Sequence, residues 1–410
     1  MRLKESAKVS LLLQLGDKGL SFLSPLLILY VFQNENMYVS LEYILSLSLL
    51  VLAFSDMGVK SYITFSGFRL ENKNLQNDVI GSIYLISLVG LVLIILSYLA
   101  SSFLCLIDRM ATFVLIQTVS LTLLTIYAKT FIVRGFPAFH NLISLIVRTV
   151  TVGILGIIYL SNVDLKLEYF FISNIILVLF ALYFSLRKSR SGNVSLGKAL
   201  LFIRKSIIYS WPLLLSTLFS LVVMNFAKIY SFSSLEKNVT SGFFFWSRII
   251  VIIQLMHLAI TPILMERIYK GDAATVIRGG VMRIYSMAIT LGCLGVLFLY
   301  QLITSTDIMS APPFGFIDFS ILLFYTVTWC FSAFFEAFYS SENRNRVILI
   351  YSSITVAIYG ILMIILRPNT VRGILVIMLV VGIVQNILLI ATVSGNNRGV
   401  KKVKKDKAFN

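Results

Sequence analysis

Charged side chains are scarce in this sequence. Asp, Glu, Lys and Arg together make up 13% of its 410 residues, whereas an ordinary soluble domain contains about 25%. Hydrophobic residues make up 58%, and the mean hydropathy is +0.91. A water-soluble fold of this composition would lack the polar side chains needed to cover its surface. The composition therefore excludes an ordinary soluble protein and predicts an integral membrane protein.

Cysteine and histidine are also rare. Cys105, Cys293 and Cys330 lie in apolar segments, at spacings that fit neither a disulfide framework nor a zinc site. His140 and His257 have no partner at the spacing of a metal site or a catalytic triad. The gaps between apolar runs contain no glycine-rich phosphate loop, paired-carboxylate site or nucleophile elbow. We therefore expect no catalytic residue, no metal and no cofactor, and a protein that is not an enzyme.

Acidic residues are outnumbered by basic ones, 18 against 35, which gives a formal net charge of +17. A positive balance can indicate nucleic-acid binding, but here the basic residues are divided among short gaps and form no continuous basic surface. We expect no nucleic-acid partner. The basic segment 1–8 precedes an apolar stretch that contains Asp17 and Lys18 and no small-residue cleavage site, so we interpret this stretch as a retained first span and not as a signal peptide.

Long apolar runs fill the chain. A spanning helix needs about 20 mostly apolar residues, and the runs show no alternating polarity, so they predict helices and not strands. The first half contains six such runs, at 9–32, 39–59, 79–106, 110–133, 141–160 and 169–186; the second half contains six more, at 207–232, 240–265, 277–303, 317–340, 347–366 and 374–393. The sequence predicts an all-α integral membrane protein with about twelve transmembrane helices.

Lysine and arginine in the gaps predict the orientation, because translocated loops tend to lack them. With a cytoplasmic N-terminus, the outer gaps hold only Arg109, Lys166, Lys237, Arg367 and Arg372. Both termini are then cytoplasmic. The longest gap is basic and contains serine and glycine, as expected of a linker. We predict an N-terminal lobe at 1–188, a cytoplasmic basic linker at 189–205, a C-terminal lobe at 206–395 and a basic cytoplasmic tail at 396–410.

Basic residues also occur inside the predicted spans. They are Lys18, Lys129, Arg148, Lys228, Arg248 and Arg283. An ionised side chain at mid-span costs at least about 2.5 kcal/mol, so such residues normally face a bundle interior, a charged partner or a water-filled cavity. They are the candidate functional residues of the chain.

Lys18 is the deepest of them, about 15 Å into the first span at 1.5 Å per residue. Gln14, Lys18, Ser21 and Pro25 are spaced by three or four residues, so one side of this span is polar. Two interpretations follow: Lys18 pairs with an acid on another helix, or it contacts an anion in a cavity.

The other basic residues differ in depth. Arg148 and Arg248 lie about 10–12 Å from the nearer ends of their spans, which favours a cavity as much as a structural role. Lys228 is close to the outer end of its span, where snorkelling alone would explain it. Lys129 and Arg283 lie near cytoplasmic ends, and for both we favour anchoring at the membrane surface.

Two carboxylates within spans are candidate coupling sites. Asp17 either neutralises a neighbouring base or binds a coupling ion, H⁺ or Na⁺. Glu336 lies on a polar face of the span at 317–340 and is either a proton or cation site or half of a salt bridge. The aromatic run at 243–246, near the outer end of its span, favours an interfacial belt over a sugar-stacking site.

Several short motifs accompany the predicted topology of twelve spans in two sixes with cytoplasmic termini. They are Phe-Ser-Asp-Met-Gly at 54–58, Ile-Val-Arg-Gly at 132–135, Trp-Pro-Leu-Leu-Leu at 211–215, and Asn225 with Lys228. With this combination the chain resembles the Wzx-type polysaccharide flippases of the multidrug/oligosaccharidyl-lipid/polysaccharide (MOP) exporter superfamily. The resemblance covers nearly the whole chain, but it is diffuse. Relatives often carry an acidic residue where this chain has Asn225, which argues against ion coupling at that position.

The resemblance implies two lobes around a central cationic cavity that opens alternately to each side. The expected activity is the translocation of an undecaprenyl-pyrophosphate-linked oligosaccharide, an O-antigen or capsule repeat unit, across the bacterial cytoplasmic (inner) membrane. Lys18 and Arg248 would hold the pyrophosphate. The expected partners are this lipid-linked substrate, membrane lipids, a polysaccharide polymerase and a chain-length regulator, within lipopolysaccharide or capsule biosynthesis.

Two alternatives stay open. A cation-coupled multidrug antiporter, like the MATE members of the same superfamily, would rely on acids such as Asp17 and Glu336. A membrane-embedded glycan polymerase or acyltransferase would need a long outer loop or a supported histidine, neither of which is visible in the sequence.

Overall fold

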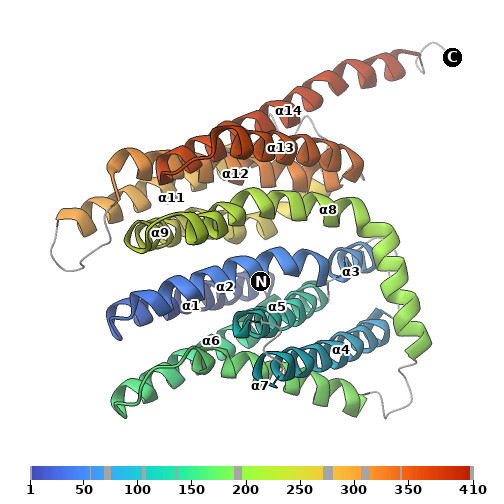
Figure 1. Ribbon diagram of the computed structural model, residues 1–410. Coiled ribbons are helices and arrows are strands. Elements are labelled where there is room, and N and C mark those ends of the chain that lie inside the picture. Colours follow the sequence, from blue (N-terminus) through green and yellow to red (C-terminus); the bar gives the residue numbers. More distant parts are fainter. Residues whose placement is uncertain are drawn as a thin grey trace. The chain divides into compact units, whose positions relative to one another are not determined.

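A computed structural model of the protein describes residues 2–55, 57–68, 75–103, 108–133, 137–188, 196–270, 280–305, 314–341 and 344–406. Within these ranges the secondary structure is helical and contains no strand. Figure 1 shows the arrangement of the helices within each part of the chain. The all-α integral membrane fold that the sequence predicts is confirmed.

The helices follow the predicted spans closely. The first half contains α1 (Arg2–Tyr30), α2 (Glu35–Ser55), α3 (Val59–Phe68), α4 (Leu75–Phe103), α5 (Arg109–Val133), α6 (Pro137–Leu160) and α7 (Leu167–Lys188). The second half contains α8 (Leu196–Ser234), α9 (Lys237–Lys270), α11 (Gly280–Ser305), α12 (Phe316–Ser341), α13 (Asn345–Leu366) and α14 (Val371–Asp406). Each of the twelve predicted runs overlaps one long helix.

Nine helices of the described residues are long and apolar enough to cross a membrane: α2, α4, α5, α6, α7, α11, α12, α13 and α14. The other three long helices, α1, α8 and α9, have 29, 39 and 34 residues. They are long enough to cross, since about 20 residues span the hydrocarbon layer, but each includes side chains outside the described residues, to which the count of nine is limited. The exact count of twelve spans therefore stays a prediction.

The second predicted run is wrong at its C-terminal end. We predict one span at 39–59, whereas α2 ends at Ser55 and α3 begins at Val59. Met57 and Gly58 between them have φ angles of +47° and +72°, which a helix cannot accommodate. A left-handed turn therefore separates the spanning helix from the short helix α3.

Other helix ends have local causes in the sequence. The side-chain oxygen of Asn34 accepts a hydrogen bond from the backbone N–H of Met37 at 2.9 Å, which caps the start of α2. The Asp108 carboxylate accepts one from the N–H of Met110 at 3.1 Å at the start of α5. Arg367, with φ of +40°, ends α13.

The chain divides into two compact units, Met1–Leu218 and Phe219–Asn410. The division falls inside α8. Residues 196–205 of the predicted linker form the first turns of this helix, while residues 189–195 lie outside the described residues. The predicted domain bounds stay predictions, and we describe each unit by itself.

In the N-terminal unit, α5 occupies the centre, where it packs against α2, α3, α4, α6 and α7, and α1 packs against α6. The first part of α8 is fixed to the turn between α2 and α3: the hydroxyl of Ser210 donates a hydrogen bond to the carbonyl oxygen of Gly58 at 3.1 Å. Tyr62 of α3 packs its ring against Phe202 and Tyr209 of α8. Burial, and then the Asp78 carboxylate, raise the pKa of Tyr62, so its hydroxyl stays protonated.

In the C-terminal unit, α12 packs against α9, α13 and α14, and α11 packs against α9. Aromatic side chains fill the core, including Trp246, Tyr285, Phe319 and Phe334, all of them buried. These rings come from three helices, α9, α11 and α12, and hold the unit together.

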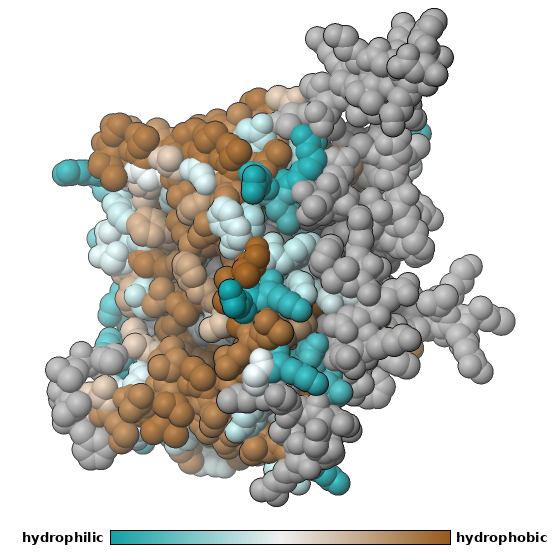
Figure 2. Space-filling view, turned by 90° about the vertical axis from the view of Figure 1, so that its right-hand side faces the viewer, coloured by the Kyte–Doolittle hydropathy of each residue, from teal (hydrophilic) through white to brown (hydrophobic). Residues whose placement is uncertain are grey.

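Large hydrophobic side chains are exposed on many helices. Leu160, Ile364 and Phe298 are examples, and Figure 2 shows hydrophobic residues over much of the described face that it presents. Soluble monomers rarely expose such broad apolar surface, whereas lipid tails are a matching solvent for it. The exposed residues therefore fit contact with a bilayer.

Candidate functional site

A polar cluster lies between α1 and α6 in the N-terminal unit. The Asp17 carboxylate accepts a hydrogen bond from the Ser144 hydroxyl at 2.5 Å, and the Lys18 ammonium lies 3.4 Å from its other oxygen. Asp17 is buried, with 5% of its side chain exposed, whereas 39% of the Lys18 side chain is exposed. The cluster thus joins a buried anion to a cation that remains accessible.

The sequence next to Asp17 explains why the two helices come so close. A Cβ atom on Gly16 would lie 3.3 Å from a methyl group of Leu145 on α6, which is tighter than ordinary contact. Small residues such as glycine at a helix–helix contact let the two backbones approach closely inside membranes. Because α6 approaches here, Ser144 is within hydrogen-bonding reach of Asp17.

The ion pair bears on both interpretations of Lys18. Within the described residues its acidic partner is Asp17, the preceding residue of the same helix. Both interpretations, the acid on another helix and the anion in a cavity, stay predictions. Asp17 also accepts a hydrogen bond from Ser144. It contacts one side of the Lys18 ammonium, and 39% of the lysine side chain stays exposed. The exposed part of the lysine can still contact an anion.

The polar cluster continues into the interior of the N-terminal unit along α6. Arg148 lies one turn beyond Ser144 and is partly buried. Thr151, two turns beyond Ser144, shares a hydrogen bond of 2.5 Å with Ser173 of α7. All three positions lie on one face of α6, since they are separated by four and three residues.

A buried amide network follows on α7 and α5. The Asn174 side chain donates a hydrogen bond to the side-chain oxygen of Gln117 at 2.8 Å, and its own oxygen accepts one from Ser120 at 3.0 Å. All three side chains are buried. The sequence analysis missed these residues, because a single amide in each span shows nothing of its partner. The sequence does contain one clue to this network: an amide side chain within an apolar run. Burying an amide without a hydrogen-bond partner is costly, so such a side chain indicates a partner on another helix.

In the C-terminal unit, Lys228 lies near an aromatic ring of α9, the helix that carries Arg248. The Lys228 ammonium is 5.8 Å from the centroid of the Phe244 ring, within the range of a cation–π contact. Arg248 is partly buried one turn beyond Phe244 on α9. Asn225 is buried, and its amide donates to the carbonyl oxygen of Leu221 at 3.0 Å. The amide therefore serves its own helix.

The remaining candidates have different surroundings. Lys129 of α5 is partly buried and within electrostatic reach of Lys60 on α3. Arg283 is exposed on α11. Glu336 of α12 accepts a hydrogen bond from the Gln385 amide of α14 at 3.3 Å.

The aromatic run at 243–246 is buried and is not an interfacial belt. Phe243, Phe244, Phe245 and Trp246 are at most 1% exposed. Trp246 packs against Tyr300 and other rings of the C-terminal unit, with ring centroids 4.9 Å apart for this pair. The preference for a belt is therefore wrong, since a belt residue must face the headgroup region.

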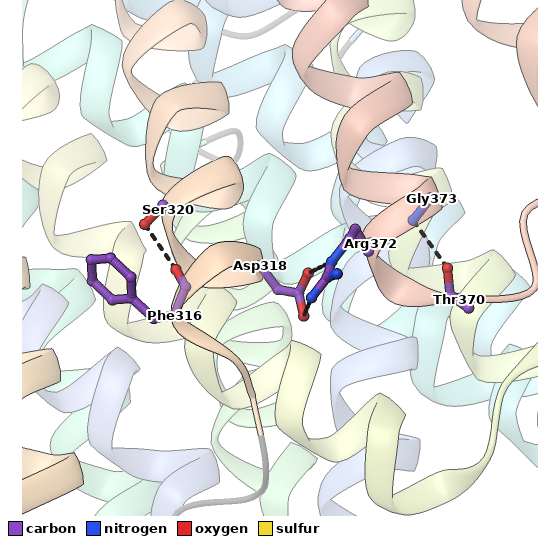
Figure 3. A network of polar contacts seen from close by, with 6 residues as sticks. All are labelled: Phe316, Asp318, Ser320, Thr370, Arg372 and Gly373. Atoms are coloured by element: carbon purple, nitrogen blue, oxygen red, sulfur yellow. Dashed lines mark hydrogen bonds and ion pairs between the residues drawn. The ribbon is translucent and has the colours of Figure 1, made fainter.

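An ion pair in the C-terminal unit connects the first turn of α12 to the first turn of α14. The Arg372 Nε donates to the Asp318 carboxylate at 2.7 Å (Figure 3). The Thr370 hydroxyl accepts a hydrogen bond from the N–H of Gly373 and caps α14. An exposed pair of this kind contributes about 0–1 kcal/mol, so it orients the two helix ends more than it stabilises them.

Cysteine chemistry adds nothing to these clusters. Cys293 and Cys330 are free thiols, and Cys105 lies outside the described residues. Among the described residues, no group of three or more His, Cys, Asp or Glu side chains is placed to hold a metal ion.

Solved structures with a similar fold include MATE transporters. A mutant of the Vibrio cholerae MATE transporter VcmN aligns with a TM-score of 0.60 at 14% identity, over 97% of this chain and 96% of that one. A multidrug resistance MATE family transporter of the MOP superfamily, in an outward-facing conformation, aligns with a TM-score of 0.60 at 14% identity, over 98% and 97%. The eukaryotic MATE transporter AtDTX14 aligns with a TM-score of 0.61 at 12% identity, over 96% and 95%.

No protein-family model matches the chain, and no curated protein matches it significantly. At 12–14% identity the likeness defines the fold: this is a multi-pass membrane protein with the fold of the MATE transporters over nearly its whole length. Fold alone does not specify a substrate.

Proposed function

We propose that this protein is a membrane transporter of the MOP superfamily that moves an undecaprenyl-pyrophosphate-linked oligosaccharide across the cytoplasmic membrane by alternating access. The observation that carries the choice of substrate is the partly exposed Lys18 ammonium in the middle of α1. A permanent positive charge at that depth is costly unless water or an anion reaches it. The MATE fold supports the coarser conclusion, a transporter.

Charge favours an anionic substrate over a cationic drug. The predicted spans contain six candidate basic residues and two candidate carboxylates, Asp17 and Glu336. Asp17 is already shared between Lys18 and Ser144. A pyrophosphate offers several anionic oxygens, which ammonium and guanidinium groups bind by charge-assisted hydrogen bonds. Lys18, Arg148, Arg248 and Lys228 are the proposed ligands of the phosphates.

Asp17 is the proposed coupling residue. Its carboxylate is buried and held by Ser144. Protonation of Asp17, or binding of Na⁺ to it, would release Lys18 from its ion pair and change the charge available to the substrate. Cation binding to Asp17 would then favour substrate binding to Lys18, and such a coupling between two sites is the minimum requirement for coupled transport.

A second candidate is a cation-coupled multidrug antiporter. One of the structural neighbours is described as a multidrug resistance transporter, and the buried Asp17 suits cation coupling equally well. The two candidates differ in the substrate: a drug antiporter exports apolar cations and has no use for a lysine beside the coupling carboxylate.

Surface glycan in a flippase-null bacterial cell tests the proposal. The wild-type chain is expected to restore surface glycan, whereas Lys18→Ala and Arg248→Ala are each expected to reduce it at least about tenfold, the effect of losing about 1.4 kcal/mol of substrate binding. Arg283→Ala is the matched control, because this exposed arginine is expected to anchor α11. Membrane levels of each variant are measured by immunoblot.

Three results would contradict the proposal. If the wild-type chain, present at normal levels, restored no glycan with any repeat unit tested, the assignment of the substrate would be wrong. If both alanine variants restored glycan fully, the assignment of Lys18 and Arg248 as its ligands would be wrong. Resistance to cationic drugs without glycan restoration would favour the antiporter.

A further inference from the structure

The helix α14 is longer than the unit that it helps to build. It begins at Val371 and ends at Asp406, whereas its apolar span ends at Ala391. Residues 392–406, which we call the extension, continue the same helix for about 22 Å at 1.5 Å per residue. Figure 1 shows α14 projecting beyond the ends of α12 and α13.

Two charged layers mark where this unit meets the surfaces of the bilayer. One is the ion pair of Asp318 and Arg372. At the other, the Tyr339 hydroxyl of α12 donates to the carbonyl oxygen of Leu389 on α14 at 2.8 Å, and the Arg344 guanidinium lies 5.4 Å from the centroid of the Tyr339 ring. From Asp318 to Tyr339 the α12 helix rises about 31 Å, which matches a hydrocarbon layer about 30 Å thick. The helix α14 therefore reaches one membrane surface near Leu389, and the extension lies outside the hydrocarbon.

The extension is basic, and most of its charges share one face. Its basic residues outnumber its single acidic residue, Asp406, by five to one; they are Arg398, Lys401, Lys402, Lys404 and Lys405. Residues 398, 401, 402 and 405 follow the i, i+3, i+4, i+7 spacing that places residues on one face of a helix. We call these four residues the basic face. Lysine and arginine set the orientation of a span by their number, so orientation alone does not require this spacing.

The sequence of the extension does not favour a helix by itself. Arg398 with Lys402, and Lys401 with Lys405, are like-charge pairs at i, i+4, which destabilise a helix. The segment 395–399 is Gly-Asn-Asn-Arg-Gly, and its glycines and asparagines have low helix propensity. The helix nevertheless continues through the whole extension. An anionic surface along the basic face would remove the repulsion and favour the helix that is observed.

The basic face lies at the depth of lipid headgroups and the solution next to them. The apolar run ends at Val393, and Arg398 and Lys405 lie about 8 Å and about 18 Å beyond it along the helix axis. The headgroup layer is about 5–8 Å thick, and the potential of an anionic surface extends about 8 Å further at physiological ionic strength. The length of lysine and arginine side chains adds to this reach. Arg346, exposed in the first turn of α13, adds a positive charge at the same end of the unit.

We propose that the basic face of the extension binds the headgroups of anionic phospholipids, on the side of the membrane at which α14 ends. The lipid phosphates neutralise the four like charges and thereby hold the extension as a helix. A soluble phosphate has the same chemistry, but it offers no continuous surface along two turns of helix. The proposal concerns the extension alone and does not rest on the proposed function.

Hydrogen exchange of the full-length protein in lipid nanodiscs tests the proposal. The nanodiscs contain phosphatidylcholine, either alone or mixed with the anionic phosphatidylglycerol. We expect the amides of residues 395–406 to exchange at least about tenfold more slowly with phosphatidylglycerol, because each basic residue near an anionic surface adds to the binding. We expect the difference to disappear in about 1 M NaCl, where the Debye length falls to about 3 Å. Residues 371–391 are the internal reference and should exchange equally in both lipids.

Two results with the wild-type chain would contradict the proposal. Equal exchange of the extension in both lipids would show that anionic lipid does not bind it. Equal slowing by inorganic phosphate in phosphatidylcholine nanodiscs would show a site for a soluble anion and not a lipid surface.

Removal of the basic face provides the first variant. Arg398→Gln, Lys401→Gln, Lys402→Gln and Lys405→Gln are combined in one chain, which keeps the length of the extension and removes the four charges. We expect exchange of its extension to be the same with and without phosphatidylglycerol. A lipid effect as large as that of the wild type would mean that these residues are not the lipid ligands.

A second variant keeps the charge and changes only its arrangement. Val400→Lys, Lys401→Val, Lys402→Val and Val403→Lys together preserve the composition of the extension and move two of the four charges off the basic face. We expect this variant to lose most of the lipid effect. A full effect would overturn the basic face, because net charge in any arrangement would then suffice.

Discussion

At Asp17, one buried carboxylate holds two neighbours, the Ser144 hydroxyl and the Lys18 ammonium. Asp17→Asn keeps an oxygen that accepts from Ser144 and removes the charge. We expect this variant to fold and to bind the lipid-linked substrate, and to lose the stimulation of transport by an imposed proton or sodium gradient. Transport rates in proteoliposomes with and without each gradient check this, and a variant that still responds fully to its gradient would contradict the role of Asp17.

We expect replacement of Gly58 to lower the folding stability of the N-terminal unit most. Its φ of +72° is unfavourable for any side chain, and an added Cβ would collide with Ser210. Gly58→Ala is expected to cost about 1–3 kcal/mol of folding stability, visible as a lower melting temperature in detergent. Gly153→Ala is the control, because nothing lies within 4 Å of its added Cβ. If both variants melt alike, the turn does not constrain the fold.

Single residues show what hydropathy can and cannot predict. The sequence places Lys18 and Asp17 at mid-depth, because charge in an apolar run is visible locally. It does not reveal that Ser144, far along the chain, approaches Asp17, since that depends on the packing at Gly16. The same holds for His257, which has no partner in the sequence at triad spacing and is bonded to Tyr285 in the structure.

Helix pairs in each unit pack through glycines. A Cβ on Gly90 of α4 would lie 2.7 Å from a methyl group of Val119 on α5, and one on Gly382 of α14 would lie 2.5 Å from the Thr328 hydroxyl oxygen on α12. We expect Gly90→Ala and Gly382→Ala to cost about 1–3 kcal/mol each through overpacking. Gly360→Ala, which meets open space on α13, should be neutral or stabilising. Thermal unfolding of the three variants checks the order, and a Gly360→Ala variant as unstable as the others would contradict it.

The amide network joins α5 to α7 in the interior of the N-terminal unit. Asn174→Leu leaves both Gln117 and Ser120 without their shared partner, and we expect a cost of about 1–3 kcal/mol for each buried group that stays unsatisfied. Thr149→Val is the control, because its exposed hydroxyl bonds only the Leu145 carbonyl of its own helix. Chemical unfolding in mild detergent measures both, and equal stabilities would mean that water replaces Asn174.

The elements themselves could be predicted from hydropathy, since each apolar run becomes a helix. The exceptions have physical causes. The helix α2 ends early because Met57 and Gly58 adopt positive φ angles, a property of the turn that average hydropathy does not record. The aromatic run at 243–246 turns inward because α11 and α12 supply Tyr300 and Phe319 to cover it, and a sequence window contains neither.

The whole chain shares its fold with MATE transporters, and its charges support the proposed choice of substrate. Fold likeness over 96–98% of the chain comes with only 12–14% identity to the three neighbours, so side chains in the interior are free to differ between substrates. The case for an anionic substrate therefore depends on Lys18 and the other interior bases.

Leaflet exchange of a labelled lipid-linked oligosaccharide tests the central claim most directly. Purified protein is reconstituted into liposomes with a fluorescent undecaprenyl-pyrophosphate oligosaccharide, and a membrane-impermeant quencher reports the fraction in the outer leaflet. We predict that the wild-type chain exchanges the label without altering its covalent structure, and that Lys18→Ala slows the exchange about tenfold or more, the factor that corresponds to about 1.4 kcal/mol. Exchange no faster than in protein-free liposomes, or equal in wild type and Lys18→Ala, would contradict the account.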